Sequence, residues 1–218
     1  AHPHMLPDAL TAIALGALLG LRHATDADHV VAVTAIVARE RRLSRAAWVG
    51  ALWGIGHTLT LLVVGGAIVA FRLVIPPRIG LGLEFGVALM LILLGYQNLR
   101  AGDDTPSARP AVRPFLVGLV HGLAGSAAVA LLVLATIRDT LSALAYLLVF
   151  GLGTVAGMVA VTVLLAVPAM YVGARVNRLQ AGIRFAAGAL SIAFGVLLAH
   201  ELIVEGGLFS ATPTWAPH

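Results

Sequence analysis

Long apolar runs separated by short polar segments dominate the pattern of this chain. Six runs contain few charged residues, and they cover residues 9–38, 46–71, 79–99, 115–137, 141–169 and 185–203. A helix needs roughly 20 apolar residues to cross the hydrocarbon core of a bilayer, and every run is about that long or longer. The pattern therefore predicts an all-α, polytopic membrane protein with about six transmembrane helices.

A polar cluster interrupts the first run at its centre. Residues 22–29 have the sequence Arg-His-Ala-Thr-Asp-Ala-Asp-His. On an unbroken helix, with about 100° between residues, Asp28 would point away from both His23 and His29. Residues 25–28 also resemble a weak capping box ahead of an apolar run. We therefore predict that the first helix breaks here, with one half ending near His23 and the next starting near Thr25.

The side chains of this cluster are suited to binding a metal ion. Ionisable groups at membrane depth are costly to bury and usually mark a pathway or a site. Imidazole and carboxylate groups offer nitrogen and oxygen ligands to Ni²⁺, Co²⁺ or Zn²⁺, and the absence of Cys excludes thiolate ligands. We expect His23, Asp28 and His29 to form the centre of a metal site, with Asp26 as a ligand or support. The alternative is an ion-paired kink neutralised by Arg22.

Two further histidines lie deep in apolar runs. His57 follows two glycines that permit close helix packing, and we assign it to the metal site; the alternative is a core histidine bonded to a carbonyl. His121 is a pathway residue or fourth ligand, with a structural role as an equal alternative. Thr58 and Ser126 are candidate pathway residues.

A few polar side chains lie near the ends of the third and sixth runs. They are Glu84, His200, Glu201 and Glu205. They would form either an outer vestibule that attracts cations or ordinary solvated helix ends, and we favour the second interpretation.

Several motifs resemble those of a known family. The stretch His-x4-Asp-His within residues 22–29 resembles the signature of the nickel/cobalt transporter family (NiCoT/NicO), and residues 53–58 resemble its second motif. Residues 119–126 and 150–154 resemble the shorter, urease-accessory type of permease in this superfamily. The resemblance covers nearly the whole chain. It departs at residues 100–114, where many relatives carry a His-rich linker and this chain has no His.

Composition agrees with a membrane protein, and the arginines orient it. The chain is 60% hydrophobic and 11% charged, with a mean hydropathy of +0.98, whereas a soluble domain is about 25% charged. Arginines concentrate in residues 39–45, 100–113 and 175–184, which the positive-inside rule places in the cytoplasm. Both termini then lie outside, unless residues 9–38 form two short spans and move the N-terminus inside. The basic residues report topology, and we expect no nucleic-acid partner.

Related segments recur at offsets of 97 to 100 residues. Residues 20–23 resemble residues 118–121, and residues 54–56 resemble residues 151–153. Each repeat holds three spans, an odd number, so the second is inverted relative to the first, as in many secondary transporters. We predict the following division: a first three-helix repeat with the metal motif (1–99), a cytoplasmic linker (100–114), a second, inverted repeat (115–205) and a polar tail (206–218).

The resemblance and the repeats imply a secondary transporter. It would move Ni²⁺, or Co²⁺, through a His/Asp site at the bilayer midplane, in the direction of uptake across a prokaryotic cytoplasmic membrane. The alternatives are an efflux permease of the same fold and, less favoured, an intramembrane metal-dependent hydrolase. We expect no enzymatic activity and no cofactor, with the metal as transported substrate. The expected partners are the metal ion and the lipid bilayer, with a link to nickel-enzyme maturation; the oligomeric state stays open.

Single cysteines introduced at Ser107 and Ser210 test the predicted topology. The first position lies in the cytoplasmic linker and the second in the outer tail, so a membrane-impermeant thiol reagent should label them from opposite sides. Labelling of both positions from the same side would contradict the six-span arrangement.

Overall fold

The structure is a computed structural model that describes residues 5–38, 40, 42–71, 75–100, 112–122, 137, 139–173 and 177–215. Every regular element in these residues is an α-helix. The helices are α1 (Met5–His23), α2 (Ala27–Val37), α3 (Leu43–Phe71), α4 (Pro77–Arg100), α5 (Val112–Gly122), α7 (Thr140–Gly173) and α8 (Asn177–Val204). Most of the predicted fourth span, including Ser126, lies outside the described residues.

Four of these helices are long and apolar enough to cross a membrane, namely α3, α4, α7 and α8. The shorter helices α1 and α2 are the two halves of the predicted first run, and its break is confirmed. Large apolar side chains such as Leu18, Val63 and Leu164 are exposed on the outside of the molecule. Helices satisfy their own backbone hydrogen bonds, so they can present such side chains to lipid.

Three helices begin earlier than the apolar pattern predicts. The basic segment 175–184 separates the last two apolar runs, and we expected it to be a loop; most of it is helical, because α8 already begins at Asn177. Likewise α3 begins at Leu43 and α5 at Val112, inside the predicted loops 39–45 and 100–114. Ala, Leu, Arg and Gln are good helix formers, so a helix continues beyond the apolar segment that the hydropathy pattern detects.

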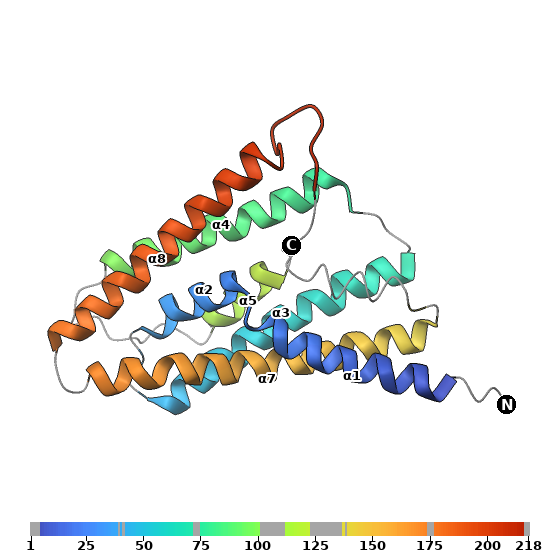
Figure 1. The fold of residues 1–218 in the computed structure, drawn as a ribbon, viewed down its shortest axis with the longest axis horizontal. Helices are drawn as coiled ribbons and strands as arrows, with labels where there is room; N and C mark the ends of the chain where they lie inside the picture. Colours follow the sequence, from blue (N-terminus) through green and yellow to red (C-terminus); the bar gives the residue numbers. More distant parts are fainter. Residues whose placement is uncertain are drawn as a thin grey trace.

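The helices form a four-helix group and a separate pair (Figure 1). In the group, α3 packs against both α5 and α7, and α7 also packs against α1. In the pair, α4 and α8 run antiparallel, since Gly95 meets Gly188 and Ala88 meets Gly195. Helix α2 lies between the group and the pair and contacts α3, α4, α7 and α8.

Glycines let the helices of the group meet backbone to backbone. A Cβ atom at Gly118 of α5 would collide with the carbonyl oxygen of Trp53 in α3. A Cβ atom at Gly20 of α1 would collide with the carbonyl oxygen of Phe150 in α7. Real Cβ atoms never approach so closely, so only glycine permits these contacts. They bring the C-terminal ends of α1 and α5 against the middle of α7 and α3.

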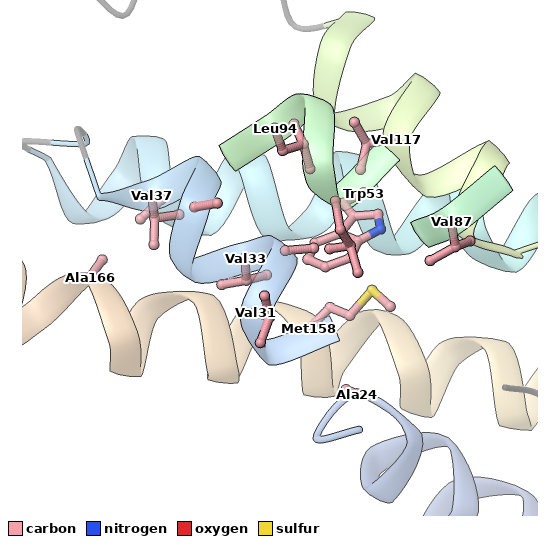
Figure 2. Close-up of a cluster of buried hydrophobic side chains, with 14 residues drawn as sticks. Ala24, Val31, Val33, Val37, Trp53, Val87, Leu94, Val117, Met158 and Ala166 are labelled. Atoms are coloured by element: carbon pink, nitrogen blue, oxygen red, sulfur yellow. The ribbon is translucent and has the colours of Figure 1, made fainter. Parts of the chain in front are cut away.

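The main hydrophobic core surrounds α2. Helix α2 buries Val31, Val33 and Val37 among side chains from four neighbouring helices, including Trp53 and Met158. Figure 2 shows these side chains meeting between the ribbons. A short helix that is apolar on all sides is stable only where it is enclosed, so the core fixes α2 in the centre of the molecule.

The close contact at Gly118 generates a stability prediction. Gly118→Ala should destabilise the protein by about 1–3 kcal/mol or more, because the new methyl group collides with backbone rather than with a movable side chain. Thermal unfolding in detergent measures the effect. Gly66→Ala in α3 is the matched control, since nothing lies within 4 Å of a Cβ atom there. Equal melting temperatures for both variants would contradict the packing described.

Candidate metal centre

The break between α1 and α2 lies in a short turn, residues 24–26. The backbone N–H of Thr25 donates to the carbonyl of Arg22 at 2.8 Å, and that of Asp26 donates to His23 at 3.1 Å. The Thr25 hydroxyl also donates to the Arg22 carbonyl at 2.6 Å. These bonds satisfy the carbonyls that the end of α1 leaves unpaired. The next helix, α2, begins at Ala27, two residues later than expected. Asp26, directly before it, has an extended backbone conformation.

The break brings four histidines from four helices into one cluster. His23 of α1, His29 of α2, His57 of α3 and His121 of α5 are all buried. Their ring centroids lie 4.6 Å apart for His23–His29, 5.0 Å for His23–His57 and 4.2 Å for His29–His121. The structure therefore unites the predicted histidines with His121, whose role the sequence left open. We call these four residues the histidine cluster.

Two carboxylates hold three of the imidazoles. Asp26 Oδ2 accepts from His23 Nδ1 at 2.8 Å. Asp28 accepts from His29 Nδ1 through Oδ1 at 2.9 Å and from His121 Nε2 through Oδ2 at 2.8 Å. The Asp28 side chain is 16% exposed and that of Asp26 is 39% exposed. Asp28 is thus the inner carboxylate, and it joins α2 to α5.

The hydrogen bonds to the carboxylates place the lone pair of two imidazoles on Nε2. When Nδ1–H of His23 and His29 donates to a carboxylate, each Nε2 carries the lone pair, which is the form that binds metals. His23 Nε2 faces His57 Nε2 at 2.9 Å. Within the described part of the chain, His29 Nε2 and the Nδ1 atoms of His57 and His121 have no hydrogen-bond partner. The cluster therefore has more acceptor nitrogens than the protein itself uses.

These atoms form two overlapping groups of ligand size. One ligand atom from each of His23, His29 and His57 lies within 4.8 Å of the others, and the same holds for Asp28, His29 and His121. Nitrogen ligands about 2.1 Å from a tetrahedral ion lie about 3.4 Å apart. His29 belongs to both groups, and so it is the centre of the candidate site.

Aromatic side chains enclose the cluster. The Trp53 ring stacks on His29, with centroids 5.7 Å apart and planes 14° apart, and it meets the ring of His121 edge-on at 5.6 Å. Phe150 lies against His23 at 5.6 Å. The sequence analysis did not identify these two residues. The signal for Trp53 was its position four residues before His57, because that spacing places both side chains on one helix face.

Other predicted residues lie elsewhere. The Thr58 hydroxyl donates to the Gly151 carbonyl at 3.1 Å and so joins α3 to α7, away from the imidazoles. Arg22 is exposed and forms no ion pair with either Asp26 or Asp28. An ion-paired kink therefore does not explain the two carboxylates, and their charge is available to a cation.

Comparison with protein families matches residues 5–201 to the family described as HupE / UreJ protein. The chain belongs to the HupE/UreJ family. It is 36% identical over 220 residues to the urease accessory protein UreH of Bacillus sp. (strain TB-90), and the alignment covers 93% of this chain and 96% of the relative. No solved structure matches the chain.

The family match and the long apolar helices together show what kind of protein this HupE/UreJ member is. It is a helical, multi-pass membrane protein, as the sequence predicted. The urease-accessory part of the resemblance is confirmed, whereas the family that matches is HupE/UreJ rather than the nickel/cobalt transporter family itself. The expectation that the chain is not an enzyme is also confirmed, since its relative is an accessory protein of urease.

The position of His57 in the cluster generates a binding prediction. His57→Ala should weaken Ni²⁺ binding by about tenfold or more, because it removes a nitrogen 2.9 Å from His23 Nε2. His200→Ala is the matched control, since His200 is an exposed histidine of α8. Isothermal titration of the purified protein measures both. Equal, small effects would remove His57 from the site.

Proposed function

We propose that this HupE/UreJ protein is a secondary transporter that takes up Ni²⁺, or Co²⁺, across the cytoplasmic membrane. The observation that carries the proposal is the histidine cluster, with four buried imidazoles and two carboxylates at the break in the first span. A urease accessory protein is its relative, and urease is a nickel enzyme. Metal supply to nickel-enzyme maturation is therefore the role that we assign.

The donor set favours a divalent transition metal over a hard cation. Imidazole ligands suit Ni²⁺, Co²⁺ and Zn²⁺, whereas Mg²⁺ and Ca²⁺ prefer oxygen ligands throughout. The four imidazoles of the histidine cluster outnumber the two carboxylates beside them, Asp26 and Asp28. Asp26 and Asp28 supply negative charge and hold the rings, which is the support that metal-binding histidines commonly have.

The packing supports two inverted repeats, residues 1–99 and 115–205, joined by the linker 100–114. Helix α1 runs parallel to α7, since Gly16 meets Tyr146 and Gly20 meets Phe150. In the same way, α5 runs parallel to α3, since Gly118 meets Trp53 and Gly122 meets His57. Helices α3 and α7 are antiparallel, and so are α4 and α8. Helices at equivalent places in the two halves therefore point in opposite directions, as inverted repeats require.

The histidine cluster lies where the two proposed repeats meet. His23, His29 and His57 come from the first, and His121 comes from the second. A site shared between inverted repeats is accessible to each side in turn when one repeat moves against the other. Because Asp28 bonds to His29 and to His121, such a movement would change the ligand set itself.

Asp28→Asn tests the proposal in proteoliposomes. The amide keeps the shape of the side chain, but it has one acceptor oxygen where two imidazoles donate. The initial rate of Ni²⁺ uptake should therefore fall at least about tenfold, with folded protein still present in the membrane.

Asp104→Asn, in the predicted linker, is the matched control and should transport at the wild-type rate. Uptake at the wild-type rate by both Asp28→Asn and His29→Ala would overturn the site. Counterflow in vesicles loaded with Ni²⁺ separates uptake from efflux.

A further inference from the structure

The chain has three tryptophans, and the structure places them in different surroundings. Trp48 of α3 is exposed on the outside of the molecule. Trp215 lies on Gly80 near the start of α4, and its Nε1–H donates to Glu84 Oε1 at 2.9 Å. Glu84 is buried, so it is not a solvated helix end, as the sequence interpretation had it. Trp53 is fully buried and contacts the histidine cluster.

Trp53 contacts the same two imidazoles that bond to Asp28. Its ring stacks on His29, with planes 14° apart and centroids 5.7 Å apart, and it meets His121 edge-on at 5.6 Å. Asp28 accepts from His29 Nδ1 and from His121 Nε2. The carboxylate thus holds one nitrogen of His29, and the indole covers one face of its ring. Together these two contacts resist rotation of the imidazole, so that Nε2 keeps its direction.

Packing fixes the position of the indole. Trp53 belongs to the core around α2, together with Val33, Val117 and Met158 (Figure 2). A Cβ atom at Gly118 would lie 2.7 Å from Trp53 Cδ1, so a glycine in α5 provides room for the ring. A side chain enclosed by a close-packed core has few alternative rotamers. Trp53 therefore presents a defined face to His29.

A related arrangement occurs at His23. Its Nδ1 is held by Asp26, and the ring of Phe150 lies against it at 5.6 Å with planes 39° apart. Both imidazoles whose Nδ1 bonds to a carboxylate therefore also have an aromatic ring against them. Of the two pairs, Trp53–His29 is the closer to parallel, and an indole attracts positive charge more strongly than a phenyl ring does.

We propose that Trp53 is a positioning residue for the transported cation, because the face of its indole stabilises the metal-bound form of His29. This inference rests on the proposed function. A divalent ion bound at His29 Nε2 draws electron density out of the imidazole, so the ring becomes more positive. The negative face of an indole attracts positive charge within about 6 Å of its centroid, most strongly where water is excluded. The stack therefore strengthens when the ion binds and favours binding without adding a ligand.

Fluorinated tryptophans test this stabilisation while keeping the shape of the side chain. Trp48→Phe and Trp215→Phe together leave Trp53 as the single tryptophan, and their Kd for Ni²⁺ should equal that of wild type, because the histidine cluster is untouched. Growth of a tryptophan auxotroph on mono-, di- or trifluorotryptophan then modifies residue 53 alone. Each ring fluorine withdraws electron density from the face of the indole. The Kd for Ni²⁺, measured by isothermal titration in detergent, should therefore rise with each fluorine, by about three- to tenfold over the series.

A matched series has Trp48 as the single tryptophan, with Phe at residues 53 and 215. Its Kd should not depend on fluorination, because Trp48 is exposed and lies outside the core. A Kd that stays constant when Trp53 is fluorinated would overturn the proposal, because a residue that only fills space keeps its effect in every analogue.

Substitutions at Trp53 provide a second, independent measurement. Trp53→Phe keeps a weaker aromatic face, whereas Trp53→Leu keeps apolar burial alone. The Kd for Ni²⁺ should rise from wild type to the Phe variant and again to the Leu variant. Equal Kd values for wild type and Trp53→Phe would contradict a role for the indole face, and this comparison stands even if the Leu variant does not fold.

The fluorescence of Trp53 separates this inference from the proposed function. Ni²⁺ quenches a tryptophan that lies close to it, so in the variant with Trp53 as the single tryptophan, quenching should give the same Kd as the titration. If Ni²⁺ binds and quenches but fluorination leaves the Kd unchanged, the proposed function stands and the role of Trp53 falls. If wild type binds no Ni²⁺, the proposed function itself falls, and this inference falls with it.

Discussion

Burial of ionisable groups in an apolar interior is the constraint on which this structure depends. A carboxylate or imidazole removed from water is costly unless it is hydrogen-bonded. Asp28 meets this requirement by accepting from His29 and His121, and Asp26 meets it by accepting from His23. These bonds can form only because the end of α1, the beginning of α2 and the helices α3 and α5 all lie close to one point. The polar cluster therefore sets the arrangement of four helices, although it supplies little apolar packing of its own.

Glycine contacts make that arrangement possible. Side chains of ordinary size at Gly20 or Gly118 would separate the helix pairs α1–α7 and α5–α3. In a bilayer, helices gain little from hydrophobic association, because lipid tails are as apolar as leucine. Close backbone approach and interhelical hydrogen bonds supply the packing instead, such as the bond from Ser191 Oγ to the Leu91 carbonyl at 2.7 Å. The same close approach brings the ring centroids of His57 and His121 to 6.1 Å from each other.

Trp53 connects the chemistry of the centre to the packing around it. One face of its ring stacks on His29, and the residue also belongs to the core that surrounds α2. That core includes side chains of α4, the helix against which residues 205–215 pack. Packed side chains therefore connect the α4–α8 pair to α2. Because α2 carries Asp28 and His29, this core lies directly between the histidine cluster and the outer pair.

The sequence alone determined the helical class, the break in the first apolar run and three of the four clustered histidines, His23, His29 and His57. These features follow from local patterns: run length predicts the spans, and five ionisable groups inside an apolar run indicate both a break and a candidate site. The bond between Asp28 and His121, 93 residues apart, was decided only by the tertiary structure. So were the stacking of Trp53 on His29 and the burial of Glu84 beneath Trp215. Periodicity identifies which side chains share a face of one helix. Only the packing of the helices decides which neighbouring helix that face contacts.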